Sequence, residues 1–420
     1  MEKIATGEIV IFAGAGISTE NKAYCATTFY EEIKADLNIS DDPTFPDLMT
    51  RFCDQPDGRI KLLEKIRHRF GYFRSFEDFY DRMSRFHRAL TPLYMITDVV
   101  TTNWDNFFER ECEFDPFVYD GDMAFWDAAK RRVMKIHGSI TNFGSIVATA
   151  EDYRQSSKRL NDGPLGAQLK SLIARKTVVY TGYSLSDDNY LRLIRNIAKM
   201  MAGNIPQSYF ISPSIEKDRI QTAPIPLIPI ETDGAYFFER IRELISERCK
   251  ITRDAAFVRC AILLDKLVEH HDKTAKNFIK TQHPLLIFAL SYQDGLAHAL
   301  RRILRMRKTG EYHSLDHVHS LVHGYTGRFD EFIKRKDYWN AAYAEGYKNG
   351  MMFLLLASTD SEATEPPIFE LPFQTDVHSI AAVLKRSKMA MPKAVRIEAQ
   401  RILTELPKGA QLVPDHSPYL

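Results

Sequence analysis

Cysteine is scarce in this sequence and widely scattered. None of its five cysteines forms a CxxC pair; they are Cys25, Cys53, Cys112, Cys249 and Cys260. An odd, dispersed set excludes a disulfide framework and predicts reduced thiols in a cytoplasmic protein. Because closed zinc sites need four Cys or His ligands at short spacings, we expect no structural zinc and no other metal.

Long apolar runs are missing too. The longest, residues 285–290 and 351–357, are far shorter than the roughly 20 residues that cross a bilayer as a helix, so no membrane partner is expected. The apolar run at residues 9–13 follows Glu2 and Glu8, and it predicts a strand rather than a signal peptide.

Charge of one sign is not in excess either. The chain has 56 Lys+Arg against 55 Asp+Glu, so its net charge does not favour a nucleic-acid or membrane-surface partner. Its 420 residues are 45% hydrophobic and 26% charged, which excludes wholesale disorder and a collagen-like repeat. This length allows two or three domains.

The first part of the chain alternates short apolar runs with helical patterns. Continuous rather than alternating apolarity is typical of strands that are covered on both faces. Strands are predicted at residues 9–12, 95–100, 133–136, 177–181 and 209–211, and helices at 76–90, 105–112, 165–174 and 189–201. This order favours an α/β fold with a Rossmann-like, doubly wound parallel sheet. Pro229 would confine a last strand at residues 227–230 to an edge.

The strand pattern ends near residue 235, and helices are predicted from there on. They are expected at residues 235–250, 255–269, 285–307, 337–356, 377–387 and 393–406, with a long loop at 358–372 and an extended tail from 407. We therefore expect a Rossmann-like domain at residues 1–235 and an all-α domain at 236–420. Large apolar helix faces tend to be buried in interfaces, so the second domain is expected to mediate self-assembly or partner docking.

A glycine-rich turn follows the first predicted strand. Residues 14–18 read Gly-Ala-Gly-Ile-Ser. Glycines at such a turn let the backbone approach a pyrophosphate, and the N-terminus of a following helix supplies amide donors. Thr19 replaces the third glycine of the dinucleotide-binding fingerprint, so a structural turn without a ligand stands as the alternative.

Three more polar motifs stand at the ends of predicted strands. Residues 101–105 read Thr-Thr-Asn-Trp-Asp and contain Asn103, and residues 135–139 contain His137 followed by glycine. A second glycine turn begins at Gly182 and contains Ser184. A neutral imidazole at such a position can accept a proton near pH 7.

Each motif also has a structural interpretation. Asn103 can cap a helix that begins at Trp104, and Ser186 or Asp187 can cap the helix that follows the second turn. His137 can be a buried histidine with a structural role. The shared placement favours function, because the carboxyl ends of parallel strands meet at one crevice, where open α/β sheets bind ligands.

With these motifs together, the sequence resembles the sirtuin family. The pattern of that family is G-A-G-I-S, T-x-N-x-D, H-G and G-x-S, and it matches residues 14–18, 101–105, 137–138 and 182–184. The resemblance covers roughly residues 5–235, and it is the combination of motifs that makes it specific.

The sequence departs from typical sirtuin deacylases in two ways. It has no zinc ribbon built from CxxC pairs, and residues 19–26 do not resemble the family's G-I-P-D-F-R stretch. The turn at 182–187 and the helical second half are more similar to the defence-associated sirtuin-like proteins of prokaryotes. That resemblance implies infection-triggered NAD hydrolysis with a partner such as a HerA-type ATPase, a short Argonaute or a nucleotide-sensing domain.

The same resemblance implies roles for individual residues toward NAD as the substrate. Asn103 would contact the nicotinamide ribose and position a water, His137 would act as the base, and Asp105 would lie near the nicotinamide pocket. The implied dinucleotide-binding residues are Gly14, Ala15, Gly16, Ser18, Thr102, Gly182 and Ser184.

The leading hypothesis is therefore an NAD hydrolase that releases nicotinamide and ADP-ribose. It would deplete NAD in antiphage defence by abortive infection, as a homo-oligomer and through a partner such as a HerA-type ATPase. The alternatives are a non-catalytic subunit that senses NAD or ADP-ribose, and a protein deacylase or ADP-ribosyltransferase. The missing zinc cysteines argue against deacylation, and the presence of both Asn103 and His137 argues against a sensor.

Two clusters in the second half stand outside this hypothesis. The i,i+4 pairs 313/317 and 319/323 can each share a helix face and bind a metal, with a polar helix or an interface as the alternative. These histidines are His313, His317, His319 and His323. Residues 301–308 form a basic run, which predicts a solvated helix face, with contact to nucleic acid or a partner as the alternative.

Overall fold

The computed structural model divides the chain into two compact units, Met1–Cys249 and Lys250–Leu420, and each is described here by itself. It describes residues 1–22, 25–185, 187–371, 373, 377–385, 392–405 and 413–418. The boundary expected after residue 235 falls inside α12 (Gly234–Ile245), a helix of the first unit that packs against α6 (Arg85–Leu90).

The described part of the first unit contains a seven-stranded sheet with the order β3-β4-β2-β1-β5-β6-β7. Every neighbouring pair in it is parallel. The strands are β1 (Ile9–Ala13), β2 (Asp98–Thr101), β3 (Asp115–Phe117), β4 (Arg132–Lys135), β5 (Thr177–Thr181), β6 (Ser208–Ser212) and β7 (Leu227–Glu231). The predicted α/β fold with a doubly wound parallel sheet is confirmed.

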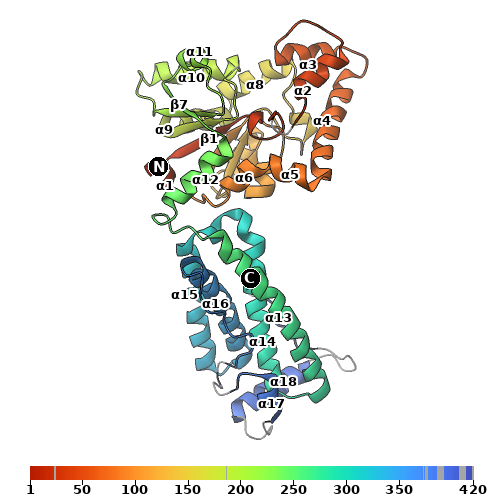
Figure 1. The fold of residues 1–420 in the computed structure, drawn as a ribbon, viewed down its shortest axis with the longest axis vertical. Helices are drawn as coiled ribbons and strands as arrows, with labels where there is room; N and C mark the ends of the chain where they lie inside the picture. Colours follow the sequence, from red (N-terminus) through yellow and green to blue (C-terminus); the bar gives the residue numbers. More distant parts are fainter. Residues whose placement is uncertain are drawn as a thin grey trace. The chain divides into compact units, whose positions relative to one another are not determined.

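Helices cover both faces of this sheet, which explains the continuous apolarity of the central strands (Figure 1). Val10 and Phe12 of β1 pack in one cluster with α8 (Ala150–Asp162), α9 (Pro164–Arg175) and α10 (Asp188–Met200). On the other face, Phe86 of α6 contacts Phe108 of α7 (Phe107–Cys112) and Phe238 of α12, with ring centroids 6.3 and 5.5 Å away. All five residues of β1 are therefore buried.

The predicted elements differ from the structure where local polar contacts end a helix or where a strand is short. The helix expected at 76–90 is two helices, α5 (Glu77–Met83) and α6, divided at Ser84, whose hydroxyl donates to the Tyr80 carbonyl at 2.7 Å. The sequence analysis missed β3, which has three residues and lies at a sheet edge. The edge position predicted for β7, which contains Pro229, is confirmed.

Three helices between β1 and α5 were not predicted either. They are α2 (Phe29–Asp36), α3 (Phe45–Cys53) and α4 (Gly58–Ser75), which share one hydrophobic cluster. Trp104, which follows β2, contacts the rings of Phe29 and Phe45 at 6.0 and 6.1 Å. This contact joins the helical cluster to the carboxyl edge of the sheet.

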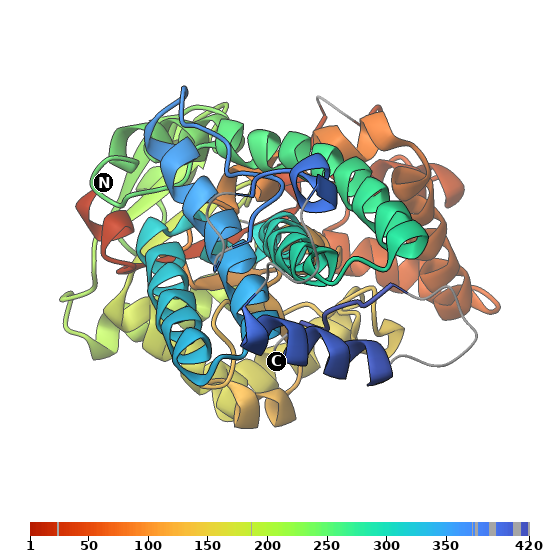
Figure 2. The ribbon, with the colours of Figure 1, turned by 90° about the horizontal axis from the view of Figure 1, so that it is seen from below.

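The second unit is helical, as predicted, and α14 (Leu285–Arg305) lies at its centre. Figure 2 shows α14 nearly end-on, with α13 (Asp254–Thr281) and α16 (Tyr338–Thr359) beside it. The remaining helices described are α15 (Leu315–Arg335), α17 (Ile380–Lys385) and α18 (Lys393–Glu405). In the described part of the tail, His416 stacks on Tyr343 with ring centroids 4.0 Å apart.

The histidine cluster is not arranged as a metal site. His313 is buried in a short 3₁₀ turn before α15, so the 313/317 pair does not share a helix. Across the described residues, no three His, Cys, Asp or Glu side chains gather as metal ligands would. Within the basic run, Arg302 donates to the Tyr312 hydroxyl and Arg307 to Asp254, so part of this run serves contacts within the unit.

None of the helices in the described ranges is long and apolar enough to cross a membrane.

The close contact between α14 and α16 depends on small residues. A Cβ at Gly346 would lie 2.0 Å from the Tyr292 carbonyl oxygen, and one at Gly295 would lie 2.1 Å from the Tyr343 carbonyl oxygen. The two backbones therefore touch where glycine leaves space.

We expect Gly346→Ala to destabilise the protein by about 1–3 kcal/mol, because the added methyl group overpacks the α14–α16 contact. Gly324→Ala in α15 is the matched control, since a Cβ there meets no atom within 4 Å. Alanine at this exposed helical position should stabilise by roughly 0.5–1 kcal/mol. Denaturant unfolding of both variants measures the difference, and equal midpoints would contradict the close packing.

Candidate active site

Two glycine turns dock against each other at the carboxyl ends of β1 and β5. The Gly16 amide donates to the Gly182 carbonyl at 2.9 Å, and the Gly14 amide donates to the Thr181 carbonyl at 3.0 Å. Gly182 has a φ of +59°, and a Cβ there would lie 2.4 Å from the Ile17 nitrogen. A Cβ at Gly14 would lie 2.4 Å from the Gly182 carbonyl oxygen. Glycine is required here by contact between the turns themselves.

The helix expected directly after the first turn is absent, which corrects the sequence interpretation. Only a three-residue 3₁₀ turn, Ala15–Ile17, follows β1, and α2 begins at Phe29. The amides of Gly16, Ile17 and Ser18 already donate to carbonyls of Gly182, Gly14 and Ala15. The anion site of a helix N-terminus is therefore not built at this turn.

Asn103 is buried at the end of β2 and does not cap a helix, because α7 begins at Phe107. Its Nδ2 donates to the Gly14 carbonyl at 3.2 Å and lies 3.4 Å from the Ser18 hydroxyl. Its Oδ1 is buried and has no hydrogen-bond partner among the described residues. A buried acceptor without a partner costs about 1–3 kcal/mol, so it marks a place where a ligand can supply the missing donor.

Asp105 is also buried and is tied to the first turn. The Ser18 hydroxyl donates to its Oδ2 at 2.9 Å, and its Oδ1 accepts from the Phe107 amide at 3.2 Å. Burial raises the pKa of Asp105, and the charge of buried Lys135 opposes that rise. Lys135 donates to the Asp105 carbonyl and to the Glu109 carboxylate. Ser18, Asn103 and Asp105 thus form one connected polar group.

His137, at the end of β4, has a carboxylate partner that the sequence analysis did not assign to it. Its Nε2 lies 3.1 Å from Oδ2 of Asp187, and its ring packs against Tyr153 with centroids 4.8 Å apart. A proton on Nε2 directed at Asp187 leaves the lone pair on Nδ1. Gly138 has a φ of +87°, and a Cβ there would lie 2.1 Å from the Ser145 carbonyl oxygen, which accounts for the glycine after His137.

Asp187 also caps α10, which was one of the structural alternatives predicted from the sequence. Its Oδ1 accepts from the Tyr190 amide at 3.2 Å in the first turn of α10, while Oδ2 faces His137. The spacing of a cap to its helix could be read from the sequence, but the histidine contact joins residues 50 positions apart and leaves no local pattern. Ser186, the other capping candidate, lies outside the described residues.

The register of the sheet places these groups along one edge. Thr101 of β2 pairs with Lys135 of β4, so Asn103 and His137 each follow a paired position by two residues. Neighbouring strands lie about 4.8 Å apart.

Of the remaining expected residues, Thr102 donates its amide to the Ala13 carbonyl at 3.3 Å, and Ser184 is exposed on the second turn.

Comparison with known proteins agrees with this arrangement. Residues 97–225, which include the motifs at 101–105, 137–138 and 182–184, match the family described as SIR2-like domain. The match covers less than half of the 420-residue chain. This match confirms the resemblance to sirtuins that the motifs predicted.

Two curated proteins are similar to this chain over more than half of its length. "NAD(+) hydrolase ThsA" of Enterococcus faecium is 26% identical over 287 residues, which cover 64% of this chain and 55% of that protein. "Defense-associated sirtuin 2" of Bacillus subtilis is 23% identical over 267 residues, which cover 57% of this chain and 23% of that protein. The chain therefore matches about half of the first protein and a quarter of the second.

A small cavity lies beside the docked turns of the SIR2-like unit. Its volume is about 40 Å³, and its lining includes Gly16, Gly182, Ile211, Arg82, Arg85 and Asp233. Small-molecule sites usually have roughly 300–1,000 Å³, so this cavity alone does not hold a dinucleotide, and its lining does not include Asn103, Asp105 or His137. Arg85 pairs with Glu239 at 2.9 Å, whereas exposed Arg82 has no ion pair or hydrogen bond within the described ranges.

Proposed function

We propose that this protein hydrolyses NAD to nicotinamide and ADP-ribose in antiphage defence. The observation that carries the proposal is the unpartnered, buried carbonyl of Asn103, at the strand edge that also holds the His137–Asp187 pair. The match to the SIR2-like domain and the names of the two relatives supply the substrate and the setting.

The reaction requires that the nicotinamide ribose be oriented and that one water molecule be activated. Cleavage of the nicotinamide–ribose bond passes through an oxocarbenium-like state, and nicotinamide leaves as a neutral molecule. Water adds at the ribose carbon while that bond breaks, and its proton goes to the base. Asn103 Oδ1 would accept a hydrogen bond from the water or from a ribose hydroxyl, and the Nδ1 lone pair of His137 would take the proton.

The fixed groups near the crevice suit an anionic dinucleotide. The guanidinium of Arg82 at the cavity wall is available to a phosphate, a role that arginine fills well. Ala15, Gly16 and Ser18 on one turn and Gly182 and Ser184 on the other would flank the same ligand. We propose that the space beside the turns widens when NAD binds, because the cavity there has a volume of only about 40 Å³.

A crevice that has to widen for NAD favours activation through another protein. We propose that the helical unit carries self-assembly or docking to a partner such as a HerA-type ATPase, and that the partner opens the crevice. Incubation of the purified full chain with NAD, with and without its partner, tests the reaction. Release of nicotinamide without any acyl-peptide supports hydrolysis, whereas binding without turnover supports a sensor of NAD or ADP-ribose.

We expect Asn103→Ala to abolish NAD turnover and His137→Ala to lower the rate by about 10²–10⁴-fold, the usual cost of losing a general base. Both side chains are proposed to serve the reaction rather than a helix cap or the core, so melting temperatures should change far less than turnover. Nicotinamide release and thermal unfolding, measured on the same preparations with the partner present, check both statements. A stable Asn103→Ala protein with parental turnover would contradict the proposed site.

Asp187 allows a sharper test, because its two carboxylate oxygens have different partners. Asp187→Asn retains an oxygen that can cap α10 but loses the charge facing His137, so kcat should fall by up to about 10²–10⁴-fold at an unchanged melting temperature. Asp187→Ala removes both contacts and should lower activity and stability together. If Asp187→Asn turned over NAD at the parental rate, Asp187 would be a capping residue only.

A further inference from the structure

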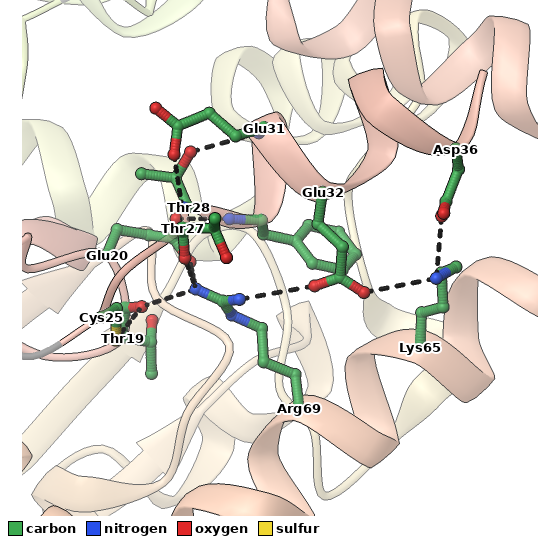
Figure 3. A network of polar contacts seen from close by, with 11 residues as sticks. Thr19, Glu20, Cys25, Thr27, Thr28, Glu31, Glu32, Asp36, Lys65 and Arg69 are labelled. Carbon is green, nitrogen blue, oxygen red and sulfur yellow. Dashed lines mark hydrogen bonds and ion pairs between the residues drawn. The ribbon is translucent and has the colours of Figure 1, made fainter. Parts of the chain in front are cut away.

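Arg69 of α4 holds both ends of the segment that connects the first glycine turn to α2. Figure 3 shows its guanidinium between this segment and the neighbouring helices. Nη2 donates to the carbonyl of Thr19 at 3.1 Å and to the carbonyl of Thr27 at 2.9 Å. Its side chain is only 11% exposed, so water competes little for these bonds.

Two glutamates complete the contacts of this guanidinium. Glu20 lies 3.3 Å and Glu32 lies 3.4 Å from its nitrogens. Glu20 also accepts from the Phe29 amide at 2.8 Å, at the first residue of α2. One cation thus connects the start of the segment, its end and the helix that follows.

The segment continues directly from the residues of the proposed site. Thr19 is buried and follows Ser18, whose hydroxyl donates to Asp105. The Glu20 amide donates to the Ala15 carbonyl at 3.0 Å. A shift of Thr19 and Glu20 would therefore move Ser18 and the turn that faces the crevice.

A cavity opens beside the described residues at the end of the segment. This cavity has a volume of about 550 Å³, and its lining includes Cys25, Ala26, Thr27, Arg69, Tyr72 and Phe73. The carbonyl oxygens of Thr19 and Thr27 are held by the guanidinium next to this space.

We propose that Arg69 is a positioning residue for NAD: it fixes the segment so that the Gly14–Ser18 turn has the shape that binds the dinucleotide. This inference rests on the proposed function, because it concerns the same site. Arg69 acts through the backbone of the segment and makes no contact with the reacting atoms. Its loss should weaken substrate and transition-state binding alike, which raises KM and leaves kcat nearly unchanged.

Lys65 is the matched control because it lies one helical turn earlier on α4. It pairs with Glu32 at 3.3 Å and with Asp36 at 2.8 Å, and it lines the same cavity. All of its described partners are on α2. Removing Lys65 therefore breaks ion pairs of the same kind and leaves the bonds to Thr19 and Thr27 in place.

The test compares Arg69→Gln, Arg69→Lys and Lys65→Gln in the full chain with its partner present. We expect Arg69→Gln to raise the KM for NAD about tenfold or more, with kcat within about twofold of the parent, as loss of uniform binding predicts. Arg69→Lys should lie between the two, because lysine keeps the charge but replaces the guanidinium, which also reaches Glu32 through Nη1, with a single ammonium. Lys65→Gln should leave KM unchanged, and it should lower the melting temperature about as much as Arg69→Gln does.

Amide hydrogen exchange of residues 19–28 and calorimetric titration with NAD separate this inference from the proposed function. Faster exchange and weaker NAD binding in Arg69→Gln, without either change in Lys65→Gln, support it even in a chain that binds NAD without turnover. Equal KM, affinity and exchange in the two variants would overturn the role of Arg69 while the hydrolase proposal stands. A parent that neither binds nor cleaves NAD overturns both.

Discussion

The contact between two backbone turns determines the geometry of the whole candidate site. The Gly16 amide donates to the Gly182 carbonyl, at a separation that leaves no space for a Cβ on either turn. The first turn then positions Ser18 for Asp105 and presents the Gly14 carbonyl to Asn103. The second turn leads to Asp187 and so to His137. The contact between the two turns thus connects the polar groups at the ends of four strands.

Some buried polar groups around this contact have hydrogen-bond partners, whereas Asn103 Oδ1, Trp104 Nε1 and Glu109 Oε2 have none among the described residues. Lys135, Asp105 and Ser18 each have hydrogen-bond partners although they are buried, as stable folds require. Asn103 uses its amide group within the protein and leaves its carbonyl oxygen without a donor. This unpartnered oxygen lowers the stability of the fold at the strand edge where the predicted motifs meet. A bound ligand can supply the missing hydrogen-bond donor there.

The sequence allowed the central sheet to be predicted because strands buried on both faces read as continuous apolar runs. It did not reveal β3, whose residues are Asp-Pro-Phe at an edge. It held a signal for α2 that was not used, the capping box of Thr28 and Glu31. Asn103 and His137 could be found from motifs at strand ends, whereas the role of Asp187 depends on the direction of one carboxylate oxygen. Arg69 belongs to no motif, and only the folded chain brings it to Thr19 and Thr27.

The proposed widening of the crevice beside the turns has a consequence for how the proposed enzyme would be kept silent. When a site is open in only a fraction of molecules, the apparent dissociation constant equals the intrinsic one divided by that fraction. A crevice open in one molecule in about a hundred would bind NAD about a hundredfold more weakly, a difference of about 2.7 kcal/mol. An activator that binds the open form about a hundredfold more tightly would raise the open fraction to about one half, and the affinity for NAD about fiftyfold. The resting activity would then be governed by an equilibrium between two shapes of the crevice rather than by the supply of substrate.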